Sequence, residues 1–177
     1  MNARNQLWPV YCLLLPVLLA TAPLIAQEPE KPTFEQLSAD SLPQPGIPSG
    51  KLTKGQFRSR LFAETVREYS VYIPAAYDGT QPACLMVFQD GHTYADVNGD
   101  FRVPVVFDNL IYRGEMPVTI AVFVNPGHVG ESLPQNPWSA SNRSLEYDTL
   151  SDLYARFLQT EMIRSEEHTS ELQSQFR

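Results

Sequence analysis

The chain has 177 residues and a formal net charge of −7, with 13 Lys and Arg against 20 Asp and Glu. Its basic residues form no run or cluster, which argues against a nucleic-acid partner, because such proteins carry a basic patch or stripe. The length leaves room for one domain of ordinary size, or for part of a larger one.

The first 26 residues have the pattern of a secretory signal peptide. Arg4 supplies a short basic start, an apolar stretch runs from Val10 to Leu19, and small residues precede Gln27. The apolar stretch is shorter than the roughly 20 residues of a membrane helix, so a cleaved signal is expected, with an uncleaved anchor as the alternative. We expect a secreted or periplasmic protein without a stable membrane anchor, in which Cys84 is the single cysteine left and no internal disulfide forms.

Residues 27–50 read as an extended leader or linker. Five prolines fall between Glu28 and Gly50, and large apolar residues are few. Such a composition favours an extended chain, because it offers little apolar surface to bury.

Residues 164–177 read as a tail that does not belong to the natural protein. Arg164 to Ser174 match, eleven residues in a row, the translation of an adapter oligonucleotide used in short-read DNA sequencing. A natural polar tail is the alternative, since Ser, Glu and Gln dominate the segment. The folded domain is therefore expected within 51–163.

Four stretches of this domain have strand patterns. Gln56 to Phe62 and Thr65 to Ile73 alternate polar and apolar residues, which predicts two antiparallel strands with one solvated face. Cys84 to Phe88 and Val118 to Val124 are nearly continuous hydrophobic runs, a pattern typical of strands that are buried on both faces.

A helix is predicted between the two hydrophobic strands. Apolar side chains recur there at helical spacing, at Val103, Val106, Phe107, Leu110 and Ile111. Gly114 stands where a helix commonly ends. Strand, helix and strand together predict a βαβ crossover with parallel strands.

A last helix is predicted from about Tyr147 to Ile163. Its apolar stripe is formed by Leu150, Leu153, Tyr154, Phe157, Leu158 and Met162. The fold class is thus α/β, with antiparallel edge strands followed by the crossover. Because the two hydrophobic strands leave unpaired edges, we expect the fragment to fold poorly alone.

Four phrases of the sequence, in this order, carry a resemblance to one family. They are Val-Tyr-Ile-Pro-Ala-Ala-Tyr at 71–77, Phe-Gln-Asp-Gly-His at 88–92, Asn-Arg-Ser-Leu-Glu-Tyr-Asp at 142–148 and Tyr-Ala-Arg-Phe-Leu at 154–158. They resemble a family of α/β-hydrolase esterases that includes enterochelin esterases, esterase D, feruloyl and acetylxylan esterases and the mycolyltransferases. The similarity covers roughly residues 50–163.

The resemblance implies that 51–163 are the N-terminal part of an incomplete α/β-hydrolase fold. It also implies a Ser-His-Asp or Ser-His-Glu triad acting through an acyl-enzyme on a small-molecule or carbohydrate ester, of a sugar, phenolic acid or siderophore. In that fold the serine lies in Gly-x-Ser-x-Gly, with the acid and histidine later in the chain. Gly130 to Pro134 offer only Gly-x-Ser, which reads as a loop. We therefore expect the triad beyond residue 163 and an inactive fragment, with an acyltransferase as the close relative of a hydrolase.

Half of an oxyanion hole is expected in the chain itself. In this fold one backbone donor follows the nucleophile and the other comes from the loop after an earlier central strand. The family pattern places that loop at Gln89 to Thr93, and the amides of Gly91 and His92 are the candidate donors. The alternative is that Asp90 and Gly91 merely turn the chain.

Three further side chains are candidates for substrate binding, because they follow the second hydrophobic strand, where loops form the crevice of an open α/β sheet. They are His128, Trp138 and Arg143, with ring stacking expected of Trp138 and carboxylate or carbonyl recognition of Arg143. The alternative for Arg143 is a structural ion pair with Glu146 or Asp148.

No metal site and no cofactor are expected, because the histidines and acids show no recognised ligand spacing. Two functional classes stay open: a secreted ester hydrolase, and a noncatalytic carbohydrate-binding or interaction domain. The continuous hydrophobic strands and the helix between them favour the hydrolase, since a β-sandwich binding module has no such unit.

Overall fold

The computed structural model describes residues 37–163, so the predicted signal peptide, the start of the leader and the adapter-like tail lie outside the described residues. Five strands form one sheet of order β1-β2-β4-β3, with β5 paired to β2. The strands are β1 (Lys51–Arg58), β2 (Thr65–Ile73), β3 (Cys84–Gln89), β4 (Thr119–Val124) and β5 (His128–Val129). The α-helices are α1 (Gly91–Ala95), α2 (Val103–Tyr112), α3 (Arg143–Tyr147) and α4 (Leu153–Phe157). No helix within 37–163 has the length and apolar character to span a membrane.

The sheet begins with the antiparallel hairpin of β1 and β2, in which Lys51 pairs with Ile73 and Arg58 with Val66. The predicted bounds of the second strand are confirmed, but the expected solvated face is wrong, because every residue of β2 except Glu68 is buried. The first strand was placed too late, because β1 ends at Arg58. The connection that follows β1 is instead tied to a buried carboxylate, Glu161, which accepts a hydrogen bond from Ser59 Oγ at 2.6 Å. The backbone amides of Arg60 and Leu61 donate to the same carboxylate, which takes the place of a strand partner for them.

The predicted βαβ crossover is confirmed. Strands β3 and β4 run parallel, from the pair Cys84–Thr119 to the pair Gln89–Val124, and α2 connects them. Gly114 ends this helical segment with a φ of 71°, a left-handed conformation that glycine adopts without a steric penalty.

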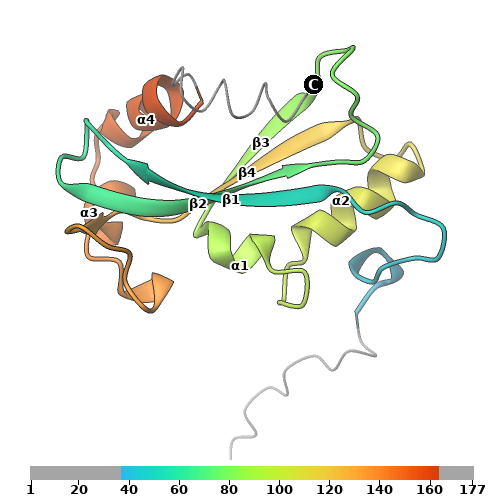
Figure 1. Cartoon of the computed structure of the whole chain (residues 1–177), viewed down its shortest axis with the longest axis horizontal. Coiled ribbons are helices and arrows are strands. Elements are labelled where there is room, and N and C mark those ends of the chain that lie inside the picture. Colours follow the sequence, from blue (N-terminus) through green and yellow to red (C-terminus); the bar gives the residue numbers. More distant parts are fainter. Residues whose placement is uncertain (1–36, 164–177) are drawn as a thin grey trace, which may run out of the picture.

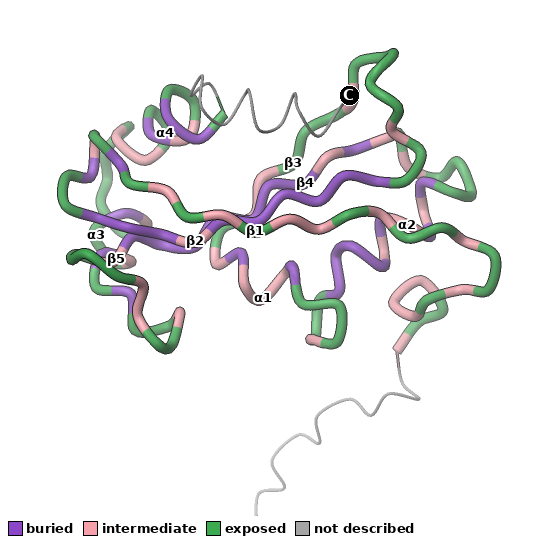
Figure 2. Tube along the Cα trace, in the orientation of Figure 1, coloured by how far each residue is buried: buried purple, intermediate pink, exposed green. Residues whose placement is uncertain are grey.

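The two hydrophobic strands differ in burial. β4 lies between two neighbours and is buried along nearly all its length, as predicted. β3 is the end strand of the sheet, so the expectation that it is buried on both faces is wrong, and Leu85 and Met86 are 48% and 42% exposed. Figure 2 shows the contrast between the exposed colouring of β3 and the buried centre of the sheet.

Helices cover both faces of the sheet. In Figure 1, α1 and α2 lie on one side and α4 lies on the other. Tyr72 and Phe123 pack with the α2 residue Phe107 on the first side. Val71 and Val122 belong to a second cluster, around Phe157 of α4. Because successive side chains of a strand point to opposite faces of the sheet, β2 and β4 contribute to two separate cores.

The last predicted helix, from about Tyr147 to Ile163, begins later than expected. The α3 helix ends at Tyr147, and α4 starts at Leu153 and continues into the π-helical turn η4 (Leu158–Met162). The break contains Thr149, Ser151 and Asp152, whose side chains compete with helical hydrogen bonding, and Leu150 in it is fully exposed. The buried stripe is confirmed only in its C-terminal part.

The described part of the leader packs on α2 instead of extending freely. Its short 3-10 helix η2 (Ala39–Ser41) is followed by Leu42, and Asn109 Nδ2 donates to the carbonyl oxygens of Asp40 and Leu42 at 2.8 and 2.9 Å. The Gly50 amide donates to Asp108 Oδ1 at 2.8 Å. Side chains of α2 thus satisfy the backbone of this segment, which its proline-rich composition did not predict.

Candidate functional site

The carboxyl ends of β3 and β4 lie side by side, since Gln89 pairs with Val124. The turn of Asp90, Gly91 and His92 follows β3 directly, and Asn125 follows β4. The parallel pairing thus brings to one edge of the sheet two segments that are more than thirty residues apart in the sequence.

The turn is tight for two reasons. Asp90 has φ 50° and ψ 44°, a left-handed conformation that non-glycine residues rarely adopt. A Cβ on Gly91 would lie 2.5 Å from both Phe123 C and Val124 N, so only glycine allows this approach of the turn to the β4 backbone. The Asp-Gly pair therefore does more than reverse the chain.

Backbone amides of the turn differ in how they are used. The His92 amide donates to Asn125 Oδ1 at 2.8 Å, the Asp90 amide to Tyr147 Oη at 3.4 Å and the Thr93 amide to the Asp90 carbonyl at 3.0 Å. Within residues 37–163 the Gly91 amide has no acceptor. Of the two donors that the sequence suggested, the His92 amide is therefore already engaged, whereas the amide of Gly91, a buried residue, has no acceptor in this part of the chain.

The His92 ring is fixed on two sides. Its Nδ1 lies 3.0 Å from Asn125 Oδ1, the same oxygen that accepts the His92 amide. Because an amide oxygen only accepts, Nδ1 must carry the proton, which leaves Nε2 with its lone pair in the neutral ring. The ring also packs against Trp138, with centroids 4.6 Å apart and an interplanar angle of 82°. Nε2 is buried, and none of the described residues bonds to it.

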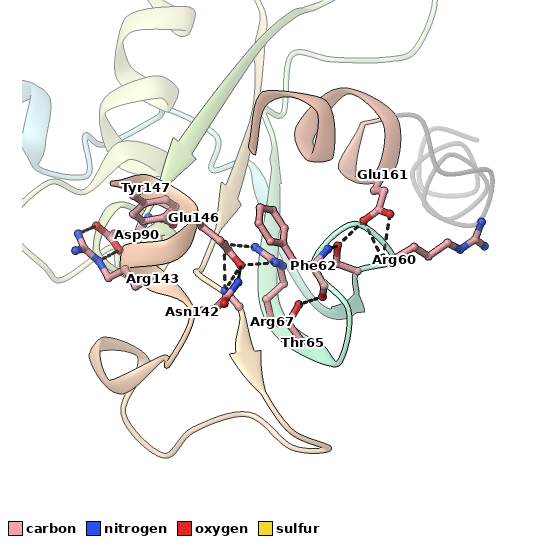
Figure 3. A network of polar contacts seen from close by, with 12 residues as sticks. Arg60, Phe62, Thr65, Arg67, Asp90, Asn142, Arg143, Glu146, Tyr147 and Glu161 are labelled. Atoms are coloured by element: carbon pink, nitrogen blue, oxygen red, sulfur yellow. Dashed lines mark hydrogen bonds and ion pairs between the residues drawn. The ribbon is translucent and has the colours of Figure 1, made fainter. Parts of the chain in front are cut away.

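Arg143 is paired with Asp90, and not with Glu146 or Asp148 as the alternative from the sequence had it. Its Nε donates to Asp90 Oδ1 at 2.9 Å and its Nη2 to Oδ2 at 2.6 Å. Hydrogen bonds to Asp90 raise the pKa of the Arg143 guanidinium. Figure 3 shows this pair beside Tyr147, whose ring centroid lies 5.2 Å from Arg143 Cζ.

Tyr147, the last residue of α3, is a further site residue that the sequence did not single out. Burial raises the pKa of its phenol to about 12, so the hydroxyl stays protonated and neutral. This hydroxyl accepts the Asp90 amide. The sequence signal for Tyr147 was its place in the phrase at 142–148 that resembles the esterase family. That phrase alone does not reveal that its partner is the Asp90 amide.

A buried ion pair holds α3 in place. Arg67 Nη1 and Nη2 donate to Glu146 Oε2 and Oε1 at 2.7 and 2.8 Å, and the Asn142 side chain and the Gly127 amide also donate to this carboxylate. Figure 3 shows Arg67 and Asn142 beside Glu146. A carboxylate in such surroundings fixes the position of its helix.

The structure brings His92, Trp138 and Arg143 together, whereas His128 lies elsewhere. Arg143 Cζ is 5.8 Å from the Trp138 ring centroid, and Trp138 itself is 55% exposed. His128 is part of β5, where it pairs with Val66. Its Nδ1 accepts a hydrogen bond from the Ser141 amide at 3.2 Å, so its contacts are with the backbone around β5.

Two pockets lie next to this site, one lined in part by His92 and the other by Asn125. The larger, of about 320 Å³, is lined by Leu52, Lys54, Glu68, Ser70, His92, Ala95, Asp96 and Val97. The smaller, of about 160 Å³, is lined by Glu68, Asn125, Pro126, Leu133, Pro134, Gln135, Pro137 and Ala140. Within 37–163 no three His, Cys, Asp or Glu side chains converge in a way that can hold a metal ion.

Residues 37–163 thus form a mixed α/β domain that partly matches structures of α/β-hydrolase esterases. The ferulic acid esterase from Anaeromyces mucronatus shares 18% identity over 73% of this chain and 47% of its own, with a TM-score of 0.49. The enterobactin esterase from Shigella flexneri shares 15% over 71% and 27%, with a TM-score of 0.48. The feruloyl esterase module from Clostridium thermocellum, solved with sinapinate, shares 21% over 49% and 30%, with a TM-score of 0.39.

The chain spans less than half the length of each of these three structures. No known family model matches the sequence, and no curated protein matches it either.

Proposed function

We propose that this chain supplies the oxyanion-binding half of the active site of a secreted serine ester hydrolase whose nucleophile lies outside residues 37–163. The observation that carries the proposal is the Gly91 amide, which lies in a tight turn at the carboxyl end of β3 and has no acceptor among the described residues. A donor held in place before the reaction is what stabilises a developing oxyanion.

The proposed chemistry is acyl transfer through an acyl-enzyme. When a serine hydroxyl attacks an ester carbonyl, negative charge develops on the carbonyl oxygen, and two fixed N–H groups stabilise it. The Gly91 amide is one of these donors, and the other belongs to the residue after the serine. Water then releases the acid, so the net reaction is hydrolysis.

The side chains around the turn suit an ester without strong charge. The charge of Arg143 is neutralised by Asp90, and the half-exposed Trp138 ring offers a surface for stacking. Together with the family resemblance, these properties favour hydroxylated esters of sugars, phenolic acids or siderophores. Export to the periplasm or the medium is part of the proposal and follows from the first 26 residues.

A carboxylate titration tests the donor directly. Acetate and ferulate carry the charge of an oxyanion, so in ¹⁵N-labelled protein we expect both to shift the Gly91 amide resonance saturably. Gly99 and Gly114 serve as internal controls, because they lie in other turns of the molecule. A Gly91 resonance that moves no more than these controls would refute the role of this amide.

A turnover assay tests the rest. We expect the purified chain to hydrolyse no 4-nitrophenyl acetate, and a version extended with the continuous reading frame of the source DNA to hydrolyse it. If the chain itself hydrolysed the ester, and this activity persisted through further purification, the placement of the nucleophile would be contradicted. An extended frame without Gly-x-Ser-x-Gly and without turnover would favour the noncatalytic binding domain.

A further inference from the structure

Asp90 has a backbone conformation that its side chain disfavours. Its φ of 50° lies in the left-handed region, which non-glycine residues adopt uncommonly, although Asp does so more often than most. Gly91 next to it has no such φ, so the strain is concentrated in a single residue. Contacts from elsewhere in the fold must therefore hold Asp90 in place.

Both ends of α3 contact Asp90. Arg143, its first residue, binds the Asp90 carboxylate through two hydrogen bonds of 2.9 and 2.6 Å. Tyr147, its last residue, accepts the Asp90 backbone amide at 3.4 Å. Figure 3 shows Arg143 and Tyr147 next to Asp90. A bidentate guanidinium fork fixes both distance and orientation, which a single contact does not.

The helix that makes these contacts is itself anchored in the core. Glu146 lies between the two contact residues in sequence and forms the fully buried ion pair with Arg67 of β2. The Arg67 guanidinium lies 4.1 Å from the centroid of the Phe157 ring, on the side of the sheet covered by α4. An unbroken series of contacts therefore runs from the core to the turn.

We propose that Arg143 and Tyr147 are positioning residues, which hold Asp90 in its left-handed conformation and so fix the Gly91 amide that follows it. What the amide then binds rests on the proposed function, whereas the holding of the turn does not. Arg143 accordingly acts through Asp90 and is not itself a catalytic residue. A plain surface ion pair is a poor alternative, because Asp90 is 18% exposed and is held at its backbone as well.

Hydrogen exchange of the Thr93 amide reports on the turn without any ligand, because this amide donates to the Asp90 carbonyl at 3.0 Å. We expect Arg143→Gln to speed this exchange about tenfold, by releasing Asp90 from the left-handed region. The amide of Val122 in the centre of β4 should keep its protection, which shows that the variant is folded.

Two double variants separate positioning from simple anchoring. Glycine adopts the left-handed conformation without strain, so Asp90→Gly combined with Arg143→Gln should return Thr93 exchange to within about threefold of the unmodified chain. Asp90→Ala combined with Arg143→Gln lacks both the ion pair and the freedom of glycine, so its exchange should stay fast. Equal exchange in the two double variants would overturn the proposal, as would unchanged exchange in Arg143→Gln.

The acetate titration connects the positioning to the proposed function. We expect Arg143→Gln to weaken the response of the Gly91 amide, and Asp90→Gly with Arg143→Gln to restore it. If acetate moves the Gly91 resonance in no form of the chain, the proposed function fails, while the exchange measurements still decide whether α3 holds the turn.

Discussion

Arg67 and Glu146 face each other with both side chains wholly removed from solvent, joined by two hydrogen bonds of 2.7 and 2.8 Å. Arg67 belongs to the inner strand β2 and Glu146 to α3, the helix that contacts the Asp90 turn. Removing one partner would leave the other charge buried and uncompensated, which is far more unfavourable than losing a pair in water.

Glu146→Gln should therefore destabilise the domain by about 3–5 kcal/mol, because Arg67 keeps its charge in a buried place without a counter-charge. Urea unfolding followed by tryptophan fluorescence measures the change. The same variant should also speed hydrogen exchange in the Asp90 turn, since α3 loses its anchor.

The matched control is Glu68→Gln. Glu68 pairs with Lys54 at 3.7 Å on the surface, where both side chains are partly exposed. Such a pair contributes less than about 1 kcal/mol. If the two substitutions changed stability equally, the special role of the buried pair would be disproved.

Asp108 should give the domain a stability that falls as pH rises. Burial raises the pKa of this carboxyl above 3.8, although Tyr72 and the Gly50 amide donate to it and partly oppose the shift. Below the pKa of the unfolded state, Asp108 is protonated in both the folded and the unfolded protein, so it causes no loss of stability. As pH rises through the unfolded and then the raised folded pKa, the folded state retains its proton longer and loses stability relative to the unfolded state.

Asp108→Asn, which keeps an oxygen acceptor for Tyr72, should remove this pH dependence; urea midpoints measured across the acidic range show it. Asp78→Asn is the counterpart with the opposite sign. Hydrogen bonds from Thr80 lower the pKa of Asp78, so its contribution is lost as pH falls. A stability difference between Asp108→Asn and the unmodified chain that stays constant with pH would contradict the shift.

Gly91→Ala should destabilise the domain by about 1–3 kcal/mol, because the added methyl meets β4 backbone atoms that do not rotate away. The nearest are Phe123 C and Val124 N, both 2.5 Å from the ideal Cβ position. Gly99→Ala is the control, since its Cβ would first meet the Asp96 side chain at 3.1 Å. Thermal unfolding compares the two, and a Gly91→Ala protein as stable as the control would show that the turn is loosely packed.

The two described histidines should be opposite tautomers in their neutral forms. His92 Nδ1 donates to Asn125 Oδ1, so its proton is on Nδ1. His128 Nδ1 accepts from the Ser141 amide, so its proton is on Nε2. A long-range ¹H–¹⁵N correlation spectrum distinguishes the two forms, and Asn125→Ala should release His92 but leave His128 unchanged. Finding both rings in the same form would contradict one of these bonds.

Much of the sheet follows from sequence periodicity alone. Alternation predicted β2 to the residue, and the hydrophobic runs with the helix between them predicted the parallel pair β3 and β4. These elements depend on the local order of polar and apolar residues, which can be read directly from the sequence. The exposure of β3 is different, because an apolar run does not say whether a neighbouring strand is present.

The site was predicted at the level of the segment and not of the contact. The phrase around Gly91 predicted a turn after β3, which the structure has, but not the engagement of the His92 amide by Asn125. Likewise, Arg143 was expected to contact substrate, with an ion pair to its near neighbours Glu146 or Asp148 as the alternative, whereas its partner Asp90 is 53 positions away. Pairs of this kind depend on how the sheet brings distant ends together, which no local pattern encodes.

The position of β3 has a practical consequence for anyone who purifies this chain. Among residues 37–163, β3 has a neighbouring strand on one side only, and it exposes apolar side chains. Such an end strand is a template for pairing with other molecules. We expect the preparation to self-associate as it is concentrated, and a lysine in place of Leu85 to keep it dispersed.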